Sequence, residues 1–262
     1  MRYLFHGVII WLLSISCIFA SPQTKIHSYH LSNGLALYVI EDHRAPAVLS
    51  SIWYNVGGSY EPNGITGVSH LLEHLMFRGS KNFPNDEIKK QVMQAGGQQN
   101  AMTSPDYTMY YQLLPASQLT LSLHLEADRM RHLILKQDEF NQEKKVVMEE
   151  RRLRIEDKPQ ALAWVRFRAA AFINNPYHQP TIGWHDDIQQ LTLPETQQWY
   201  NTWYAPNNAF LVIVGDVDSQ DTYQQVKQAF SAYAPISLPL PKTQHEISSY
   251  GVRQVSMKLN TK

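Results

Sequence analysis

The 262-residue sequence is poor in cysteine, and its only cysteine is Cys17. A chain with a single thiol has no internal disulfide, which excludes the small disulfide-stapled scaffolds of secreted proteins. An excess of either charge is also absent, because 23 basic residues balance 23 acidic ones. Without a global positive field we expect no binding of nucleic acid. Internal repeats and low-complexity tracts, which would indicate a solenoid or a disordered chain, are missing as well.

Long apolar runs are confined to the N-terminus, where residues 7–20 are mostly hydrophobic. This run is shorter than the roughly 20 apolar residues that a membrane-spanning helix needs. The basic Arg2 before it and the small residue at its end are typical of a secretory signal peptide. We therefore predict a signal peptide at residues 1–20, an exported protein (periplasmic or secreted) and no stable membrane span in the rest of the chain. Residues 14–17 make a poor lipoprotein box, so lipid attachment at Cys17 is not expected.

The remaining sequence alternates between strand and helix patterns. Residues 26–40 alternate apolar and polar around Asn33-Gly34, a strong turn signal, and predict a β-hairpin. This hairpin argues against a purely parallel sheet, so we predict the α+β class. Further strands are expected at 48–56, 106–114 and 209–217, and helices at 67–78, 84–94, 116–135, 138–157, 160–174, 195–204 and 221–232.

Proline interrupts the chain after the last predicted helix, in the segment 234–241. This composition is typical of a linker. An alternating pattern at 254–259 then predicts the beginning of another strand. We therefore expect one domain at residues 21–233, followed at 234–262 by a linker and the start of a truncated second domain.

One predicted helix carries a pattern with chemical meaning, His70-Leu-Leu-Glu73-His74, and we expect Thr66 to cap this helix. Residues on an α-helix advance by about 100°, so the two imidazoles lie about 40° apart, one above the other. Two histidines at this spacing can bind one Zn²⁺ and leave room for a protein oxygen and a water. The Glu73 carboxylate suits a general base that takes a proton from that water. The competing interpretation is a helix with scattered histidines.

A zinc site with two histidines needs a third ligand, and the charged helix at 138–157 offers several carboxylates. Spacing places Glu143 and Glu150 nearly on one face, with Glu149 turned about 100° away from Glu150. Each of them could equally belong to a solvated helix face, so spacing alone leaves the ligand open. The glutamates of this helix are Glu139, Glu143, Glu149, Glu150 and Glu156.

Several further segments accompany the motif along residues 25–260. They are Gly67-Val-Ser before it and Leu-Met-Phe-Arg-Gly-Ser after it, Gly96-Gly97-Gln-Gln-Asn100-Ala101-Met-Thr103-Ser-Pro-Asp106-Tyr-Thr108-Met-Tyr110, Glu143-Lys-Lys-Val-Val-Met-Glu149-Glu150, Pro176-Tyr177, Ile182-Gly183, Trp203-Tyr204-Ala205-Pro206-Asn207-Asn208 and Val214-Gly215-Asp216-Val217. In kind and in order they resemble the pitrilysin family of inverted zincins. This family includes insulin-degrading enzyme and the mitochondrial processing peptidase.

The resemblance implies a fold, a reaction and a set of residues. The fold would be an antiparallel-rich sheet of about six strands packed with helices, the LuxS/processing-peptidase-like domain. The function would be that of a zinc metalloendopeptidase domain with one Zn²⁺ per chain. His70, His74 and Glu150 would bind the zinc, with Glu149 as the rival third ligand. Glu73 would be the general base, and Glu143 would orient a histidine or tune the metal from behind.

The resemblance also implies how a substrate binds. Residues 99–103 would form an exposed strand edge to which a peptide or unfolded segment adds as an extra strand, in contact with Asn100 and Ala101. For Asn100, a side chain that caps a loop is an equally good interpretation. Family members consist of paired halves, and the second half supplies an Arg/Tyr pair that holds the substrate carbonyl, so we expect this chain to need a second half or partner subunit. The alternative is a non-catalytic, peptidase-like subunit that assists assembly or presents substrate, which the complete set of site residues disfavours.

Overall fold

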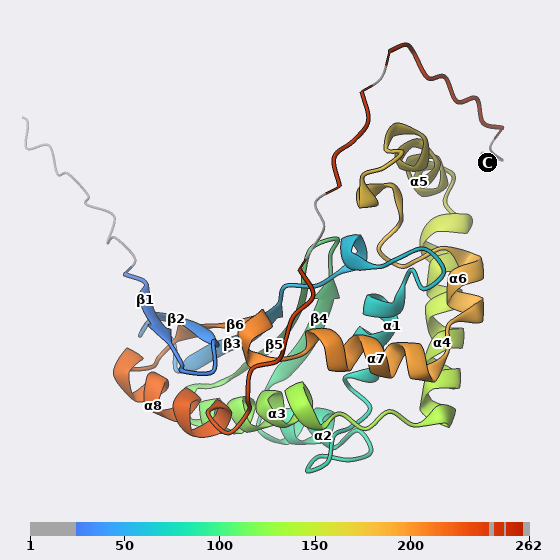
Figure 1. The fold of residues 1–262 in the computed structure, drawn as a ribbon. Helices are drawn as coiled ribbons and strands as arrows, with labels where there is room; N and C mark the ends of the chain where they lie inside the picture. The colour runs from blue at the N-terminus through green and yellow to red at the C-terminus, as the bar shows by residue number, and fades with distance from the viewer. Residues whose placement is uncertain (1–24, 241–243, 249, 259–262) are drawn as a thin grey trace, which may run out of the picture.

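The computed structural model describes residues 25–240, 244–248 and 250–258. At its centre lies a six-stranded sheet in the order β1-β2-β6-β3-β5-β4 (Figure 1). The strands are β1 (His27–His30), β2 (Ala36–Glu41), β3 (Ala47–Tyr54), β4 (Gln98–Thr103), β5 (Thr108–Pro115) and β6 (Ala209–Gly215). Every neighbouring pair is antiparallel except β2 and β6. The predicted α+β class and the antiparallel-rich sheet of about six strands are confirmed.

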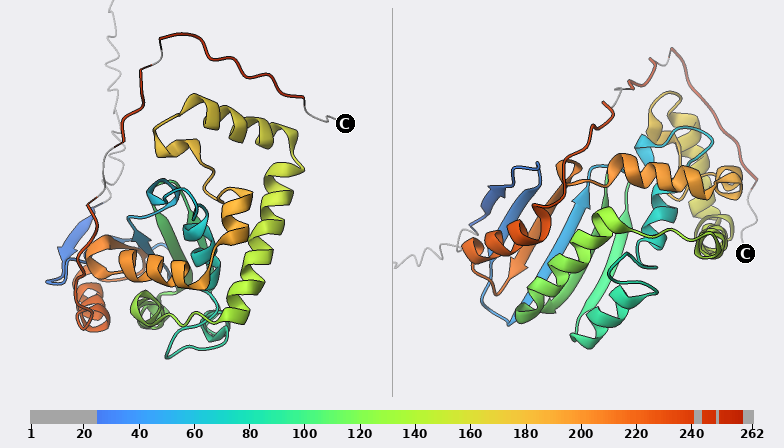
Figure 2. Two further views of the ribbon diagram at one scale, coloured as in Figure 1. Left: turned by 45° about the vertical axis from the view of Figure 1, so that its right-hand side comes forward. Right: turned by 60° about the horizontal axis from the view of Figure 1, so that its bottom comes forward.

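Eight helices accompany the sheet in the described part of the chain. They are α1 (Val68–Leu75), α2 (Glu87–Gln94), α3 (Leu119–His132), α4 (Gln137–Arg151), α5 (Pro159–Ala171), α6 (His185–Gln190), α7 (Leu193–Trp203) and α8 (Ser219–Phe230). A π-helical turn at Arg152–Glu156 continues α4. Helix α3 packs on β3 and β5, α8 on β2, and both α1 and α2 on β4. Figure 2 shows the helices gathered over one face of the sheet, while α5 stands away from it.

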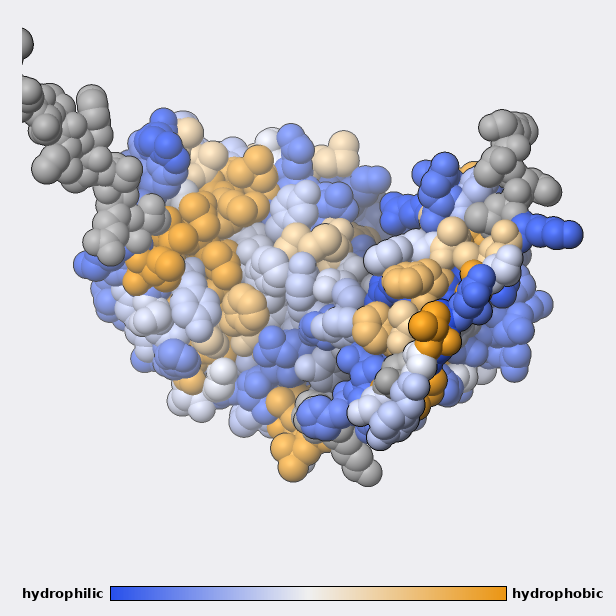
Figure 3. Space-filling model, turned by 90° about the horizontal axis from the view of Figure 1, so that it is seen from above, coloured by the Kyte–Doolittle hydropathy of each residue, from blue (hydrophilic) through white to orange (hydrophobic). Residues whose placement is uncertain are grey.

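The alternation of side chains along the strands decides which face of the sheet is buried. The covered face consists of side chains without solvent exposure, among them Leu37, Val39, Ile52, Tyr110, Leu211 and Ile213. On the opposite face Leu49 and Leu113 are exposed. Seen from above, hydrophobic residues form a band on the side where the sheet lies and a smaller group on the side of α5 (Figure 3). The core therefore lies between the sheet and α1, α3 and α8.

Helix α1 begins at a close approach between two stretches of backbone. Its N-cap is Gly67, with φ 91°, and a Cβ atom there would come within 2.5 Å of the carbonyl oxygen of Ile182. Glycine is needed at this position because it has no Cβ atom. It therefore tolerates both the positive φ and the close approach of the Ile182 carbonyl. The predicted Thr66 cap is wrong. Its hydroxyl instead donates to the Asp187 carboxylate at 2.6 Å.

The cap of α1 comes from Glu61, six residues before the helix boundary. Its two carboxylate oxygens accept the N–H groups of Gly67 at 2.6 Å and of Ser69 at 2.7 Å. The first N–H groups of a helix have no partner within the helix, and this end of α1 is buried away from water. A carboxylate here satisfies two of these donors and complements the positive end of the helix dipole.

The remaining differences from the expected elements are local. Helix α2 begins three residues later than expected because Asn85 and Asp86 adopt positive φ values of 54° and 62°. Helix α6 was not predicted, since its six residues are too short to show a period. Residues 254–258 form no strand, because a strand is stable only when it pairs with a neighbour, and none lies beside them in the described part of the chain.

Two expectations concern membranes and export. The predicted signal peptide at residues 1–20, with Cys17, lies outside the described residues. None of the helices that the structure describes has the length and apolarity needed to cross a membrane.

Glu61 should give the stability of the fold a pH dependence. Burial raises the pKa of its carboxyl from 4.5 to about 7, against the opposite effect of the two backbone hydrogen bonds. A carboxyl whose pKa is raised on folding stabilises the fold most below pH 4.5 and loses that contribution as the pH rises through 7. Glu61→Gln removes the titration. We therefore expect the free energy of unfolding of wild type relative to this variant to fall by roughly 3 kcal/mol over that range, at about 1.4 kcal/mol per pKa unit.

Urea unfolding of both proteins at steps between about pH 4 and pH 8 measures this difference. A difference that stays constant or grows with rising pH would show that folding does not raise the pKa of Glu61.

Candidate metal centre

Two helices that pack against each other, α1 and α4, bring three side chains to one point. His70 and His74 lie one turn apart on α1, and Glu150 lies on the last turn of α4. His70 Nε2 is 3.8 Å and His74 Nε2 is 3.3 Å from the two carboxylate oxygens of Glu150. One ligand atom from each residue lies within 4.8 Å of the other two. Two imidazole nitrogens and one carboxylate oxygen are a donor set typical of zinc sites that keep a fourth position open.

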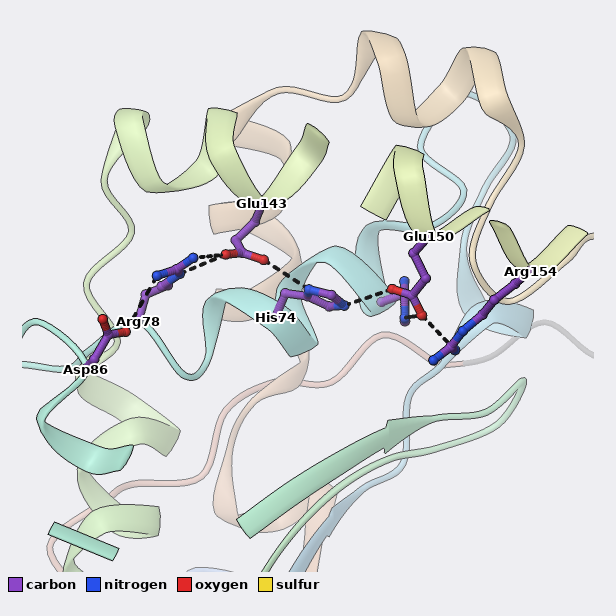
Figure 4. A network of polar contacts seen from close by, with 7 residues as sticks. His74, Arg78, Asp86, Glu143, Glu150 and Arg154 are labelled. Carbon is purple, nitrogen blue, oxygen red and sulfur yellow. Dashed lines mark hydrogen bonds and ion pairs between the residues drawn. The ribbon is translucent and has the colours of Figure 1, made fainter. Parts of the chain in front are cut away.

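His74 lies in the middle of a chain of polar contacts, which Figure 4 shows from Asp86 to Arg154. The Nδ1 atom of His74 donates to Glu143 at 3.0 Å. The other oxygen of Glu143 accepts from Arg78 Nε at 2.8 Å, and Arg78 also pairs with Asp86. A carboxylate on Nδ1 fixes the orientation of the ring, so that Nε2 faces Glu150.

The protonation states follow from burial and from these partners. Burial lowers the pKa of His70 to about 4, and the neighbouring His74 adds to this effect. Burial also acts to lower the pKa of His74, but the hydrogen bonds to Glu143 and Glu150 outweigh it and raise the pKa to about 9. The hydrogen bond from His74 lowers the pKa of Glu150 although partial burial opposes it. His70 is thus neutral and Glu150 ionised, the forms in which both residues bind metals, whereas His74, between two carboxylates, holds a proton that a metal would displace from Nε2.

Glu73 lies beside this cluster on the same helix but has a different partner. Its carboxylate accepts the hydroxyl of Thr103, at the end of β4, at a distance of 2.5 Å. Burial raises its pKa, and the hydrogen bond from Thr103 offsets part of that rise. Glu73 is therefore held by the edge strand of the sheet rather than by the α1–α4 contact.

The two neighbouring glutamates of α4 face in different directions. The Glu149 side chain is 54% exposed and pairs with Arg152 one turn later. The Glu150 side chain is only 16% exposed, and besides the histidines it contacts Arg154 at 2.6 Å. Of the two, Glu150 lies at the histidines and Glu149 points away from them.

The predicted substrate contacts lie on β4. This strand is the last in the sheet and pairs only with β5, so one of its edges is open. Asn100 is exposed, and its side-chain oxygen accepts the N–H of Ala101 at 2.9 Å. The structure thus places Asn100 and Ala101 on an edge strand, and Asn100 lies within this strand rather than in a loop.

Sequence reasoning missed three side chains of this centre: Thr103 as the partner of Glu73, Arg78 as the partner of Glu143, and Arg154 as the partner of Glu150. Arg78 lies four residues after His74 and Arg154 lies four residues after Glu150. In the predicted helices that spacing puts each arginine on the same face as the residue four positions earlier, which was a usable signal. Thr103 had no such signal, because its contact depends on how β4 packs against α1.

Comparison with known proteins places these residues in a family. The model for insulinase (peptidase family M16) matches residues 37–184, which include every residue of the centre. A second model, the peptidase M16 inactive domain, matches residues 190–260. The zinc protease PqqE of Helicobacter pylori is 37% identical over 227 residues, covering 86% of this chain and 51% of that protein. The probable mitochondrial-processing peptidase subunit beta of Arabidopsis thaliana is 24% identical, covering 84% of this chain and 41% of that protein.

Solved structures agree. A protease from Helicobacter pylori superimposes with a TM-score of 0.81 at 36% identity, over 85% of this chain and 54% of that one. The periplasmic protease PqqL from Escherichia coli has the same fold, with a TM-score of 0.78 at 24% identity, over 85% of this chain and 25% of that one. The chain spans about half the length, or less, of the curated relatives it matches. The family that the sequence motifs indicated is confirmed: this chain belongs to the insulinase family of peptidases, family M16.

Proposed function

We propose that this chain is a zinc metalloendopeptidase domain that hydrolyses peptide bonds of peptides or unfolded segments held as an extended strand. The observation that carries the proposal is the convergence of His70, His74 and Glu150, with Glu73 beside them. Ligand atoms within 4.8 Å of one another can be bridged by a single ion. The names of the relatives, which are zinc proteases, support the choice of metal.

A zinc ion held at this centre, one per chain, supplies Lewis acidity that polarises a peptide carbonyl and acidifies water. His70 and His74 would bind it through Nε2, and Glu150 through its carboxylate. Glu73 would take a proton from the attacking water and pass it to the leaving amine. Thr103 would keep the Glu73 carboxylate aimed during this transfer, since its hydroxyl already donates to one of the two oxygens.

The choice of Glu150 over Glu149 as the third ligand rests on orientation. Glu150 already faces both Nε2 atoms, whereas Glu149 is turned into solvent and paired with Arg152. Glu143 would act on the metal through His74, because a carboxylate on the far nitrogen increases the basicity of the ligating one.

The substrate would add to the open edge of β4. An extended peptide gains main-chain hydrogen bonds there, and these are independent of its sequence. Asn100 and Ala101 lie on this strand and would contact the peptide. The edge ends at Thr103, so a peptide along it would pass directly by Glu73.

The whole peptidase would also contain a second half or a partner subunit. The chain spans about half the length of the Helicobacter pylori relative, and donors that hold the substrate carbonyl would come from the other half. The alternative, a non-catalytic subunit that assists assembly or presents substrate, is disfavoured because His70, Glu73, His74 and Glu150 are all present.

We further propose that the protein is exported to the periplasm or outside the cell, with a signal peptide at residues 1–20 and without a lipid on Cys17. The relative PqqL of Escherichia coli is named a periplasmic protease, which supports this location. The boundary between a zinc-binding domain at 21–233 and a second domain beginning at 234–262 remains a prediction.

Replacing Glu73 tests the reaction directly. Glu73→Gln keeps the size of the side chain and leaves the three proposed ligands in place, so the protein should still bind about one zinc. Loss of the base should lower kcat/KM on an unstructured peptide by about 10²–10⁴-fold. Zinc content by elemental analysis and peptide cleavage measure the two effects. Undiminished cleavage by a zinc-loaded variant would refute the base, and loss of zinc would assign Glu73 to the metal.

A matched pair of variants tests the third ligand. Glu150→Gln should weaken zinc binding by more than about 100-fold, because even the outer partners of zinc ligands contribute about 10–100-fold. Glu149→Gln changes the adjacent residue in the same way and should leave zinc binding close to wild type. Competition with a chelator of known affinity measures both. A stronger loss of zinc binding in Glu149→Gln than in Glu150→Gln would assign the third ligand to Glu149.

The hydroxyl of Thr103 can be removed without changing the shape of the side chain. Thr103→Val should lower kcat by about tenfold or more, the effect of one hydrogen bond to a charged group, at nearly constant KM. Thr103→Ser keeps the hydroxyl and should restore most of the rate. Steady-state kinetics and zinc content of both variants decide the matter. Equal losses in both variants would mean that the methyl group, and hence packing, is what counts.

A further inference from the structure

A cavity of about 240 Å³ opens directly beside the candidate metal centre. It is enclosed by the end of β4, the π-helical turn, α5 and the segment 178–182. This volume lies below the roughly 300–1,000 Å³ of small-molecule sites, so the cavity fits one amino-acid side chain. Its polar lining consists of His70, Thr103, Arg154, Arg168, His178 and Thr181.

The lining of this cavity is positively charged, and no Asp or Glu side chain lines it in the part of the chain that the structure describes. Arg154 contacts the Glu150 carboxylate. Arg168, on α5, donates from Nε to the carbonyl of Tyr177 at 2.9 Å. Within the described ranges, no carboxylate lies within 4.0 Å of Arg168. Its guanidinium therefore has a neutral partner on one side and charged N–H donors to spare.

We propose that this cavity is a specificity pocket for a substrate carboxylate, the side chain of a Glu or Asp close to the bond that is cleaved. The inference rests on the proposed peptidase function and adds a substrate class to it. Arg168 is the specificity-determining residue, because a guanidinium offers paired N–H donors that match the two oxygens of a carboxylate. A lysine side chain entering the same cavity would meet two arginines and be repelled.

The position of the cavity links it to the reaction. His70 belongs both to the cavity wall and to the metal centre, and Thr103 both to the wall and to the partner contact of Glu73. A side chain that fills the cavity therefore lies within a residue or two of the peptide bond held at the centre. A charge in the cavity would therefore influence which peptide bond of the substrate is cleaved. It would not act merely by binding a distant part of the substrate.

Peptides that differ at one position test the pocket. Glu, Gln or Lys is placed in turn at the two positions on either side of the cleaved bond of a C-terminally amidated peptide. At one of these positions the zinc-loaded protein should cleave the Glu peptide about tenfold or more faster, in kcat/KM, than the isosteric Gln peptide, and the Lys peptide slowest. Affinities for the zinc-loaded Glu73→Gln variant, measured by fluorescence anisotropy, should follow the same order.

Three variants assign the effect. Arg168→Gln should reduce the Glu-to-Gln ratio to near one, and Arg168→Glu should reverse the preference toward Lys. Arg166→Gln removes the same charge from an exposed position of the same helix that does not line the cavity, and should keep the wild-type ratio.

The outcomes separate the pocket from the peptidase. Cleavage without a Glu preference at any position would overturn the pocket and leave the peptidase standing. A Glu preference in binding, with no cleavage of any peptide even when the second half is supplied, would overturn the peptidase and support the pocket. If the amidated peptides show no preference and the same peptides with a free C-terminus do, the carboxylate bound is the terminal one, which overturns the assignment to a side chain.

Discussion

The buried carboxylate of Glu143 determines how the two helices of the centre meet. Only 5% of this residue is exposed, and burying a charge costs several kcal/mol unless it is paired. Both partners, His74 and Arg78, come from α1 or the turn that follows it, so the charge is satisfied in one register of α1 against α4. In that register Glu150, two turns further along α4, falls opposite the two imidazoles. One ion-pair chain thus aligns the helices, orients a histidine and places the third acidic group.

The other end of α1 is fixed by different means. Glu61 accepts two N–H groups at the start of the helix, and Asp187 accepts the Thr66 hydroxyl just before it. The backbones of Gly67 and Gly183 touch, so neither position has room for a side chain. Helix α1 is therefore held at its start by buried polar groups and at its end by Glu143. A metal site needs ligands on elements that do not shift, and this short helix meets that need through its contacts rather than its length.

How much of the fold and of the candidate site could be predicted from the sequence depends on how far apart in the sequence the interacting residues lie. His70, Glu73 and His74 are visible in the sequence because helical periodicity puts them on one face within five residues. Glu150 was not separable from Glu149 by spacing, and it was chosen only through resemblance to a family. The structure explains the difference, since Glu149 is paired with Arg152 at the surface.

Local sequence patterns gave wrong or no predictions where a contact joins residues far apart in the sequence. Thr66 has the sequence preference of a cap, but its hydroxyl is engaged by Asp187, 121 residues away. Glu61 caps the helix from a position where no pattern marks it. Helix α6 holds Asp187 in place, and with only six residues it leaves no periodic signal. The sheet was easier to foresee because alternation along each strand reports burial directly, whereas its edge at β4 was recognised only through the family motif.

The carboxylate of Glu150 joins the metal centre to the cavity beside it. One of its oxygens lies near His70 and also contacts Arg154, while the other faces His74. The carboxylate is thus turned toward both imidazoles by the packing of α1 against α4. Arg154 forms an ion pair with the same carboxylate that would bind the metal, and so neutralises part of its negative charge. An acidic side chain entering the cavity would compete with Glu150 for Arg154 and leave more of the negative charge of Glu150 for the ion. Charge in the cavity and charge at a bound metal would therefore be coupled through this arginine.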